Sequence, residues 1–163
     1  MNYLGGNTPA YLTIVARGSH GGYMEHDADE FGPMQTKKEL LNRIRTALGG
    51  RAAEVVYYGK EDGLSTGASE DLRQASRIAE AMICEYGMDE ECGLFVGHSN
   101  DKMQDHFRDK INHLLKEEMD RTIETISRHR ENMDKLVQLL LKRNKLTADE
   151  IEDCLSQTKR ICD

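Results

Sequence analysis

The chain has 163 residues, which is enough for one ordinary domain with a substantial hydrophobic core. Its 29 acidic and 22 basic residues give a formal net charge of −7, which argues against a nucleic-acid-binding protein, because phosphate recognition requires a surplus of positive charge. The chain has neither a membrane-spanning apolar run nor a signal-peptide pattern, so we expect a cytoplasmic protein whose four cysteines are reduced thiols.

The first predicted elements are two short β-strands. The run Tyr11–Val15 is rich in residues that favour strands, and the turn Gly21-Gly22 separates it from a second such run, Tyr23–Glu25. We interpret the two runs as a small hairpin or as two edge strands.

A long helix is predicted next. Thr36 and Glu39 have the spacing of a capping box, in which each side chain binds the other residue's backbone N–H group. Apolar residues then follow at helical spacing: Leu40, Leu41, Ile44, Leu48, Ala52 and Val55. The pair Gly49-Gly50 lies inside this pattern, although a helical glycine costs about 1 kcal/mol relative to alanine. Either the helix ends there or another backbone approaches closely, and the unbroken apolar spacing favours close approach.

A second helix is expected to begin at Ser65 or Thr66 and to run to Tyr86, with Gly87 as its stop. Its apolar face comprises Leu72, Ala75, Ile78, Ala79, Met82, Ile83 and Tyr86. Asp71 projects into this face, and a carboxylate aimed at a core needs a partner. From position alone, Asp71 is either a first-turn residue that favours the helix dipole or bonds a backbone amide, or a metal-binding or catalytic residue.

The remainder of the chain is predicted to be helical, because all 14 glycines and both prolines lie at or before Gly97. Apolar residues recur every three or four positions at Phe107, Ile111, Leu115, Met119, Ile123 and Ile126. The polar stretch Ser127–Asn132 interrupts this pattern, which indicates two helices or one bent helix ending near Asn144. Thr147 and Glu150 form a second capping box that opens a short final helix.

Other candidate residues are weaker. The six histidines include no HxxxH pair, and we expect them on the surface; the acidic run His26–Glu30 is interpreted as a solvated loop. No Walker-type phosphate loop, GxGxxG or GxSxG motif occurs. The residues of this chain therefore contain no complete catalytic constellation.

Several segments together resemble the peptidase domain of FtsH-type ATP-dependent zinc metalloproteases. They occur in the family's order over nearly the whole chain and include Leu12–Gly18, Gly49–Glu54, Ser65–Leu72 and Tyr86–Met88. The segments Gly49–Glu54 and Ser65–Leu72 are specific when they are found together. In this resemblance Asp71 matches the family's third zinc ligand, which favours a metal-binding role for it. The bare surface of Gly49-Gly50 would let a neighbouring helix pack closely.

The family's HExxH motif belongs on a helix before the strand at Leu12, and we expect this chain to begin too late to contain it. Zinc chemistry needs both histidines as ligands and the glutamate as general base. The resemblance therefore implies no catalytic residue in this chain and Asp71 as its one metal ligand. Zinc is expected in the complete protein but not here, and ATP is expected on a missing domain.

The predicted fold is a mainly α-helical metalloprotease domain with a small β-hairpin or edge-strand element near the N-terminus. We expect a single domain, 1–163, with a β element and loop in 1–34, core helices carrying the zinc-ligand Asp in 35–97, and C-terminal helices in 98–163. Tyr11–Val15, as an edge strand, would bind extended substrate by strand addition.

The predicted function is the peptidase portion of an ATP-dependent zinc metalloendopeptidase that degrades unfolded proteins, with this chain alone inactive. Its partners would be protein or peptide substrates and further copies of itself, with no nucleic acid. The resemblance also implies a hexameric ring and a membrane anchor in the complete protein, with this domain on the cytoplasmic side. The alternative is a non-enzymatic helical adaptor or assembly module on the same scaffold.

A last expectation concerns the surface that the missing helix would cover. Without it, the apolar face around Ile78 and Met82 and the bare surface at Gly49-Gly50 would be open. We then expect self-association through this face, or its filling by Met1–Gly6, with a substitute partner near Asp71.

Overall fold

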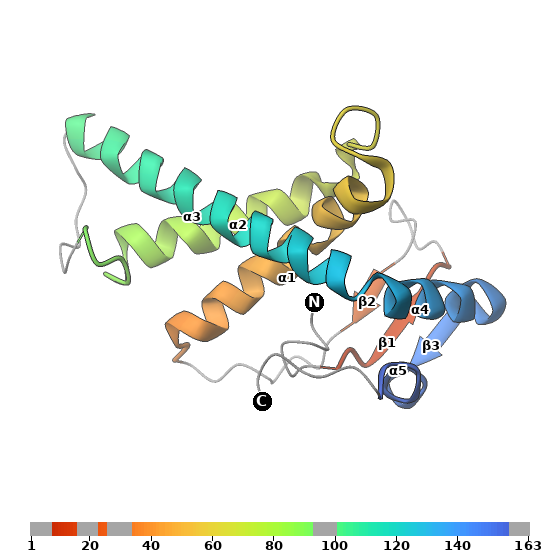
Figure 1. Ribbon diagram of the computed structural model, residues 1–163. Helices are drawn as coiled ribbons and strands as arrows, with labels where there is room; N and C mark the ends of the chain where they lie inside the picture. The colour runs from red at the N-terminus through yellow and green to blue at the C-terminus, as the bar shows by residue number, and fades with distance from the viewer. Residues whose placement is uncertain (1–7, 16–22, 26–33, 93–100, 157–163) are drawn as a thin grey trace. The chain divides into compact units, whose positions relative to one another are not determined.

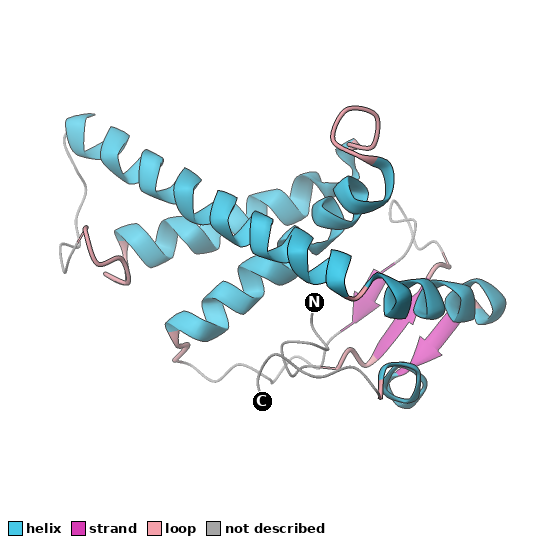
Figure 2. Ribbon diagram, viewed as in Figure 1, coloured by secondary structure: helices cyan, strands magenta, loops and turns pink. Residues whose placement is uncertain are grey.

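The computed structural model describes residues 8–15, 23–25, 34–92 and 101–156 (Figure 1). Their elements in chain order are β1 (Tyr11–Thr13), β2 (Tyr23–Glu25), α1 (Lys37–Tyr58), the 3₁₀ turn η2 (Thr66–Ala68), α2 (Ser69–Cys84), α3 (Asp101–Arg128), α4 (Arg130–Arg143), β3 (Lys145–Thr147) and α5 (Ala148–Leu155). Helices dominate and the strands are short, so the predicted fold class is confirmed (Figure 2). The chain divides into two compact units, residues 35–126 and residues 1–34 with 127–163.

Helix α1 begins at the predicted capping box. The backbone N–H of Thr36 donates to the Glu39 carboxylate at 2.6 Å, and the Glu39 N–H donates to the Thr36 hydroxyl at 3.3 Å. The helix continues through Gly49 and Gly50 to Tyr58. The first alternative, a helix that ends at the glycine pair, is therefore wrong.

The core of the 35–126 unit lies between α1, α2 and α3. In Figure 1, α3 crosses the pair formed by α1 and α2. The buried side chains that α1 and α2 contribute to this core cluster are Leu40, Ile44, Ala47, Leu48, Ala75, Ile78, Ala79 and Met82. Partly buried residues of α3 pack against them, namely Ile111, Leu114, Leu115 and Met119.

This packing corrects the expectation of an open apolar face. Ile78 is 9% exposed and Met82 is 2% exposed, because apolar side chains of α3 cover the face that these two residues form. The proposed filling of that face by Met1–Gly6 falls outside the described residues.

Helix α2 starts and stops close to the predicted positions. Ser65 is the cap of η2, which leads directly into α2. The helix ends at Cys84, and the chain then reverses through Gly87, whose φ is +59°, while the N–H of Met88 donates to the carbonyl of Met82 at 3.0 Å. Tyr86 lies beyond the helix end and is exposed, so its predicted place on the apolar face is wrong.

The other unit holds a three-stranded antiparallel sheet in the order β2-β1-β3. Leu12 of β1 lies opposite Met24 of β2 on one side and opposite Leu146 of β3 on the other. Tyr11–Thr13 is thus the central strand, and its prediction as an edge strand is wrong. Strand addition along it is excluded, since both of its sides already have partners.

The C-terminal segment forms two helices rather than one bent helix. Helix α3 ends at Arg128, α4 begins at Arg130, and Asn144, with a φ of +62°, ends α4 close to the predicted position. The second capping box is confirmed, with the Thr147 N–H donating to the Glu150 carboxylate at 3.0 Å. None of the helices described here combines the length and the apolar character that crossing a membrane requires.

Candidate functional site

Asp71 lies in the first turn of α2, and its side chain is exposed. The prediction that it projects into the apolar face is wrong, because the surface opposite it is Gly50 of α1, which has no side chain. A Cβ atom added at Gly50 would lie 3.8 Å from Oδ2 of Asp71. Within the described residues, the Asp71 carboxylate has no hydrogen bond and no ion pair. It is therefore available to a ligand.

The glycine-pair segment and the segment that carries Asp71 meet around Ser65. The Arg51 guanidinium donates to the Glu54 carboxylate and to the Ser65 carbonyl, both at 2.8 Å. Glu54 also accepts a bond from the Ser65 hydroxyl, and this bond is the main cause that holds the pKa of Glu54 below its ordinary value. The Ser65 hydroxyl in turn accepts from the N–H of Gly67 at 3.1 Å. Two motifs that are separate in sequence thus form one connected site.

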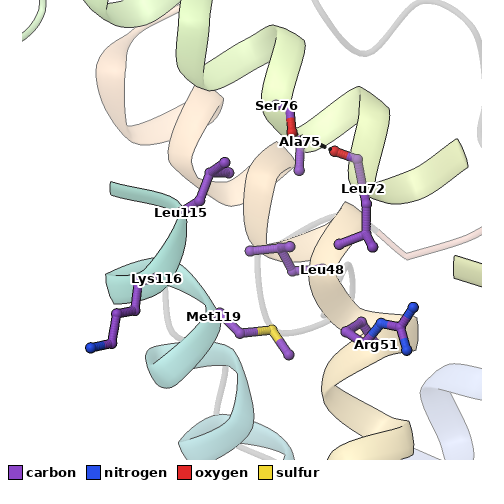
Figure 3. Close-up of a pocket in the computed structure, with 8 residues that line it drawn as sticks. All are labelled: Leu48, Arg51, Leu72, Ala75, Ser76, Leu115, Lys116 and Met119. Carbon is purple, nitrogen blue, oxygen red and sulfur yellow. Dashed lines mark hydrogen bonds between the residues drawn. The ribbon is translucent and has the colours of Figure 1, made fainter. Parts of the chain in front are cut away.

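A groove of about 250 Å³ opens beside this site, where α1, α2 and α3 meet (Figure 3). It is lined by Leu48, Arg51, Leu72, Ala75, Ser76, Leu115, Lys116 and Met119. Leu48, Leu72 and Met119 surround its centre in Figure 3, whereas the charged end of Lys116 points away. The groove is therefore apolar inside. One of its lining residues, Leu72, directly follows Asp71 in the sequence.

The Asp71 carboxylate would supply one donor atom to a zinc ion at this site. A carboxylate oxygen is an ordinary zinc ligand, and a catalytic zinc needs three protein ligands with one open position. In the part of the chain that the structure describes, no three His, Cys, Asp or Glu side chains come close enough together to hold a metal ion. Asp71 thus fits one place in a zinc site that needs two further ligands.

The predicted surface position is confirmed for two of the three histidines that the structure describes. His106 and His113 are exposed, and Cys84, Cys92 and Cys154 are free thiols. His129 is half-buried, and burial lowers its pKa. His20, His98 and the run His26–Glu30 lie outside the described residues.

Helix α3 contains two buried polar side chains, Glu118 and Thr122, that are absent from the sequence-based predictions. Glu118 of α3 is 1% exposed and forms ion pairs with Arg45 of α1 and with Arg121, the latter at 2.8 Å. The Thr122 hydroxyl, also buried, donates to the Glu118 carbonyl at 2.6 Å. Glu118 lies seven residues after Ile111, on the same apolar face of the helix, and this spacing is the signal that could have identified it.

The surroundings of Gly50 make its replacement informative. We expect Gly50→Ala to raise the free energy of unfolding of the chain by about 0.5–1 kcal/mol, because alanine favours the helix and its methyl group meets no atom closer than ordinary contact. Urea denaturation measures this change. Gly59→Ala is the matched control and should destabilise, since Gly59 has a φ of +84°. A destabilising Gly50→Ala would contradict the open surface next to Asp71.

Comparison with known proteins gives consistent matches. The family model described as peptidase family M41 matches residues 5–154. The ATP-dependent zinc metalloprotease FtsH of Mycoplasmopsis pulmonis is 33% identical in a match that covers 91% of this chain and 22% of that relative. The protein of the same name from Bacillus subtilis is 33% identical, over 86% of this chain and 24% of its own length. The chain therefore spans about a quarter of the length of the curated relatives it matches.

Proposed function

The chain belongs to peptidase family M41, and on that basis we propose that it is the peptidase portion of an ATP-dependent zinc metalloendopeptidase that degrades unfolded proteins. The observation that carries this proposal is the Asp71 carboxylate, which is exposed, without a partner among the described residues, and set against the bare helix surface at Gly50. A first-turn aspartate favours the helix dipole in any helix, but a metal site also needs an accessible carboxylate with free space beside it, and Asp71 next to Gly50 has both.

In this proposal Asp71 contributes one carboxylate oxygen to the zinc ion, and two histidines of an HExxH helix elsewhere in the complete protein contribute the others. When bound, zinc acts as a Lewis acid on the water and the scissile carbonyl. The role of Gly50 is to leave room beside Asp71 for the helix that brings those histidines. The residues that the structure describes include no group of three ligands, so we expect the 163-residue chain on its own to lose the metal.

The ATP-driven steps are assigned to the rest of the complete protein, because no phosphate-binding loop occurs in these residues. We propose unfolded polypeptides as substrates, a homo-oligomeric ring, and a membrane-anchored complete protein that holds this domain in the cytoplasm. These assignments follow the names of the relatives and the family resemblance.

The test compares the chain with the complete protein. We expect the 163-residue chain to lose zinc on dialysis against a mild chelator and to leave unfolded casein intact. The complete protein should degrade casein only with ATP, lose this activity to a strong chelator, and regain it with added Zn²⁺. Stoichiometric zinc in the dialysed chain would contradict the proposed ligand set. ATP-dependent casein degradation that survives complete zinc removal would refute the metalloprotease.

A further inference from the structure

Two side chains of α1 bind every backbone and side-chain polar group of Ser65. The Ser65 carbonyl accepts from Arg51 at 2.8 Å, its N–H donates to the Glu54 carboxylate at 3.4 Å, and its hydroxyl donates to the same carboxylate. Arg51 and Glu54 also bind each other at 2.8 Å, and both side chains are largely buried. We call the four hydrogen bonds among Arg51, Glu54 and Ser65 the Ser65 clamp.

The Ser65 clamp acts where the helix that carries Asp71 begins. Ser65 is the cap of η2, its hydroxyl accepts from the Gly67 N–H, and η2 passes into α2 without a break. A helix is stiff, so fixing its cap relative to α1 fixes the first turn, in which Asp71 lies. The carboxylate of Asp71 reaches the same helix α1 at Gly50. Ser65 and Asp71, at the two ends of this short segment, thus both lie against the same turn of α1.

The clamp also sets the charge around Asp71. Arg51 follows Gly50 directly, yet its guanidinium is bound to Glu54 and to Ser65, and it makes no ion pair with Asp71 within the described residues. The pair of Arg51 and Glu54 is neutral as a whole. Asp71 therefore keeps an unpaired negative charge, which a cation requires.

We propose that Arg51 and Glu54 are positioning residues for the metal site, and that by holding Ser65 they fix the carboxylate of Asp71 relative to α1 and keep it free for zinc. This proposal rests on the proposed function, in which Asp71 is a zinc ligand. Metal sites depend on such supporting contacts, and their loss costs about 10–100-fold in metal affinity.

The test uses two variants of the clamp and one matched control. Glu54→Ala removes the acceptor for Arg51 and Ser65, and Arg51→Lys keeps the charge but cannot bridge Glu54 and the Ser65 carbonyl at once. Glu70→Gln is the control: it removes a carboxylate beside Asp71, but the Glu70 side chain is 70% exposed, and its ion-pair partner among the described residues is the exposed Arg73. Each change is made in the complete protein and in the 163-residue chain.

Zn²⁺ affinity of the complete protein is measured by competition with a chromogenic chelator. We expect Glu54→Ala and Arg51→Lys to weaken it by about tenfold or more, with kcat lowered and KM for a peptide substrate unchanged. Glu70→Gln should remain within about twofold of the parent, as expected for an exposed pair. In the 163-residue chain, Glu54→Ala should speed hydrogen exchange at the Gly67 amide and leave core amides such as those of Ile44 and Ala79 protected.

Two results for Glu54→Ala would overturn the positioning role. One is parental Zn²⁺ affinity in Glu54→Ala together with fast exchange at Gly67, which would make the clamp purely structural. The other is unchanged exchange at Gly67, which would show that the clamp does not hold the helix start. If Asp71→Asn also keeps parental Zn²⁺ affinity, the assignment of Asp71 itself fails and the positioning role falls with it. Loss of Zn²⁺ in Asp71→Asn but not in Glu54→Ala refutes the clamp alone.

Discussion

In the complete protein, Asp71→Asn is expected to lower Zn²⁺ affinity by more than about tenfold and to reduce kcat/KM for casein-derived peptides by about a hundredfold or more. The amide keeps the shape of the side chain but removes the negative charge from the ligand oxygen. In the proposed zinc site, one of the three protein ligands then binds the metal weakly. Metal content after dialysis and steady-state peptide cleavage measure the two effects.

The same change is expected to leave the fold intact. Asp71 is exposed and has no partner among the described residues, so its replacement should alter the free energy of unfolding of the 163-residue chain by about 0.5 kcal/mol or less. Asp120→Asn, an exposed aspartate of α3, is the control and should change neither metal affinity nor turnover. Parental zinc content and turnover in Asp71→Asn would reduce Asp71 to a first-turn residue of a helix.

Most of the helical structure could be predicted because its signals are local. The capping boxes at Thr36 and Thr147 place the starts of α1 and α5, since each depends on two residues three positions apart. The turn at Gly87 limits α2 in the same way. Periodicity identified the apolar faces of α1, α2 and α3, and their side chains do form the core of the helical unit.

The incorrect predictions concern residues whose strand pairing or burial depends on a distant part of the chain. Nothing near Tyr11–Thr13 indicates that its second partner is Lys145–Thr147, so the local pattern predicts a hairpin or an edge strand rather than a central strand. A helical wheel places Asp71 on the side of the core, but burial also depends on the neighbouring helix, and the Asp71 carboxylate lies beside Gly50, which has no side chain to cover it. The resemblance to a family identified Asp71 as a candidate ligand, whereas only the structure shows Ser65 bound to Arg51 and Glu54.

The largest effect on stability is expected from the buried ion pair between α1 and α3. Glu118 is 1% exposed, while the side chain of Arg45 is 19% exposed, so the two partners are not equivalent. Arg45→Met leaves the buried Glu118 carboxylate with Arg121 as its one ion-pair partner among the described residues, and we expect it to lower the free energy of unfolding by about 3 kcal/mol. Glu118→Leu should cost less, about 1–2 kcal/mol, because Arg45 can turn toward water and the new side chain is apolar.

The double variant Arg45→Met/Glu118→Leu separates the two costs. It removes both charges together, so no buried ion is left unpaired, and an apolar pair of similar size takes the place of the ion pair between α1 and α3. We expect it to recover to within about 1 kcal/mol of the parent, which corresponds to strong coupling between the two sites. Urea denaturation of the 163-residue chain and its variants gives all the required free energies.

Arg73→Met is the matched control, because it also removes an arginine paired with a glutamate, but the two side chains are 63% and 70% exposed. Its cost should be no more than about 0.5 kcal/mol, the usual contribution of a surface pair. The contrast between Arg45 and Arg73 then measures burial rather than charge. Equal losses of unfolding free energy in Arg45→Met and Arg73→Met would contradict the burial of Glu118. A double variant less stable than Arg45→Met would show that the charges, not their pairing, hold α3 against α1.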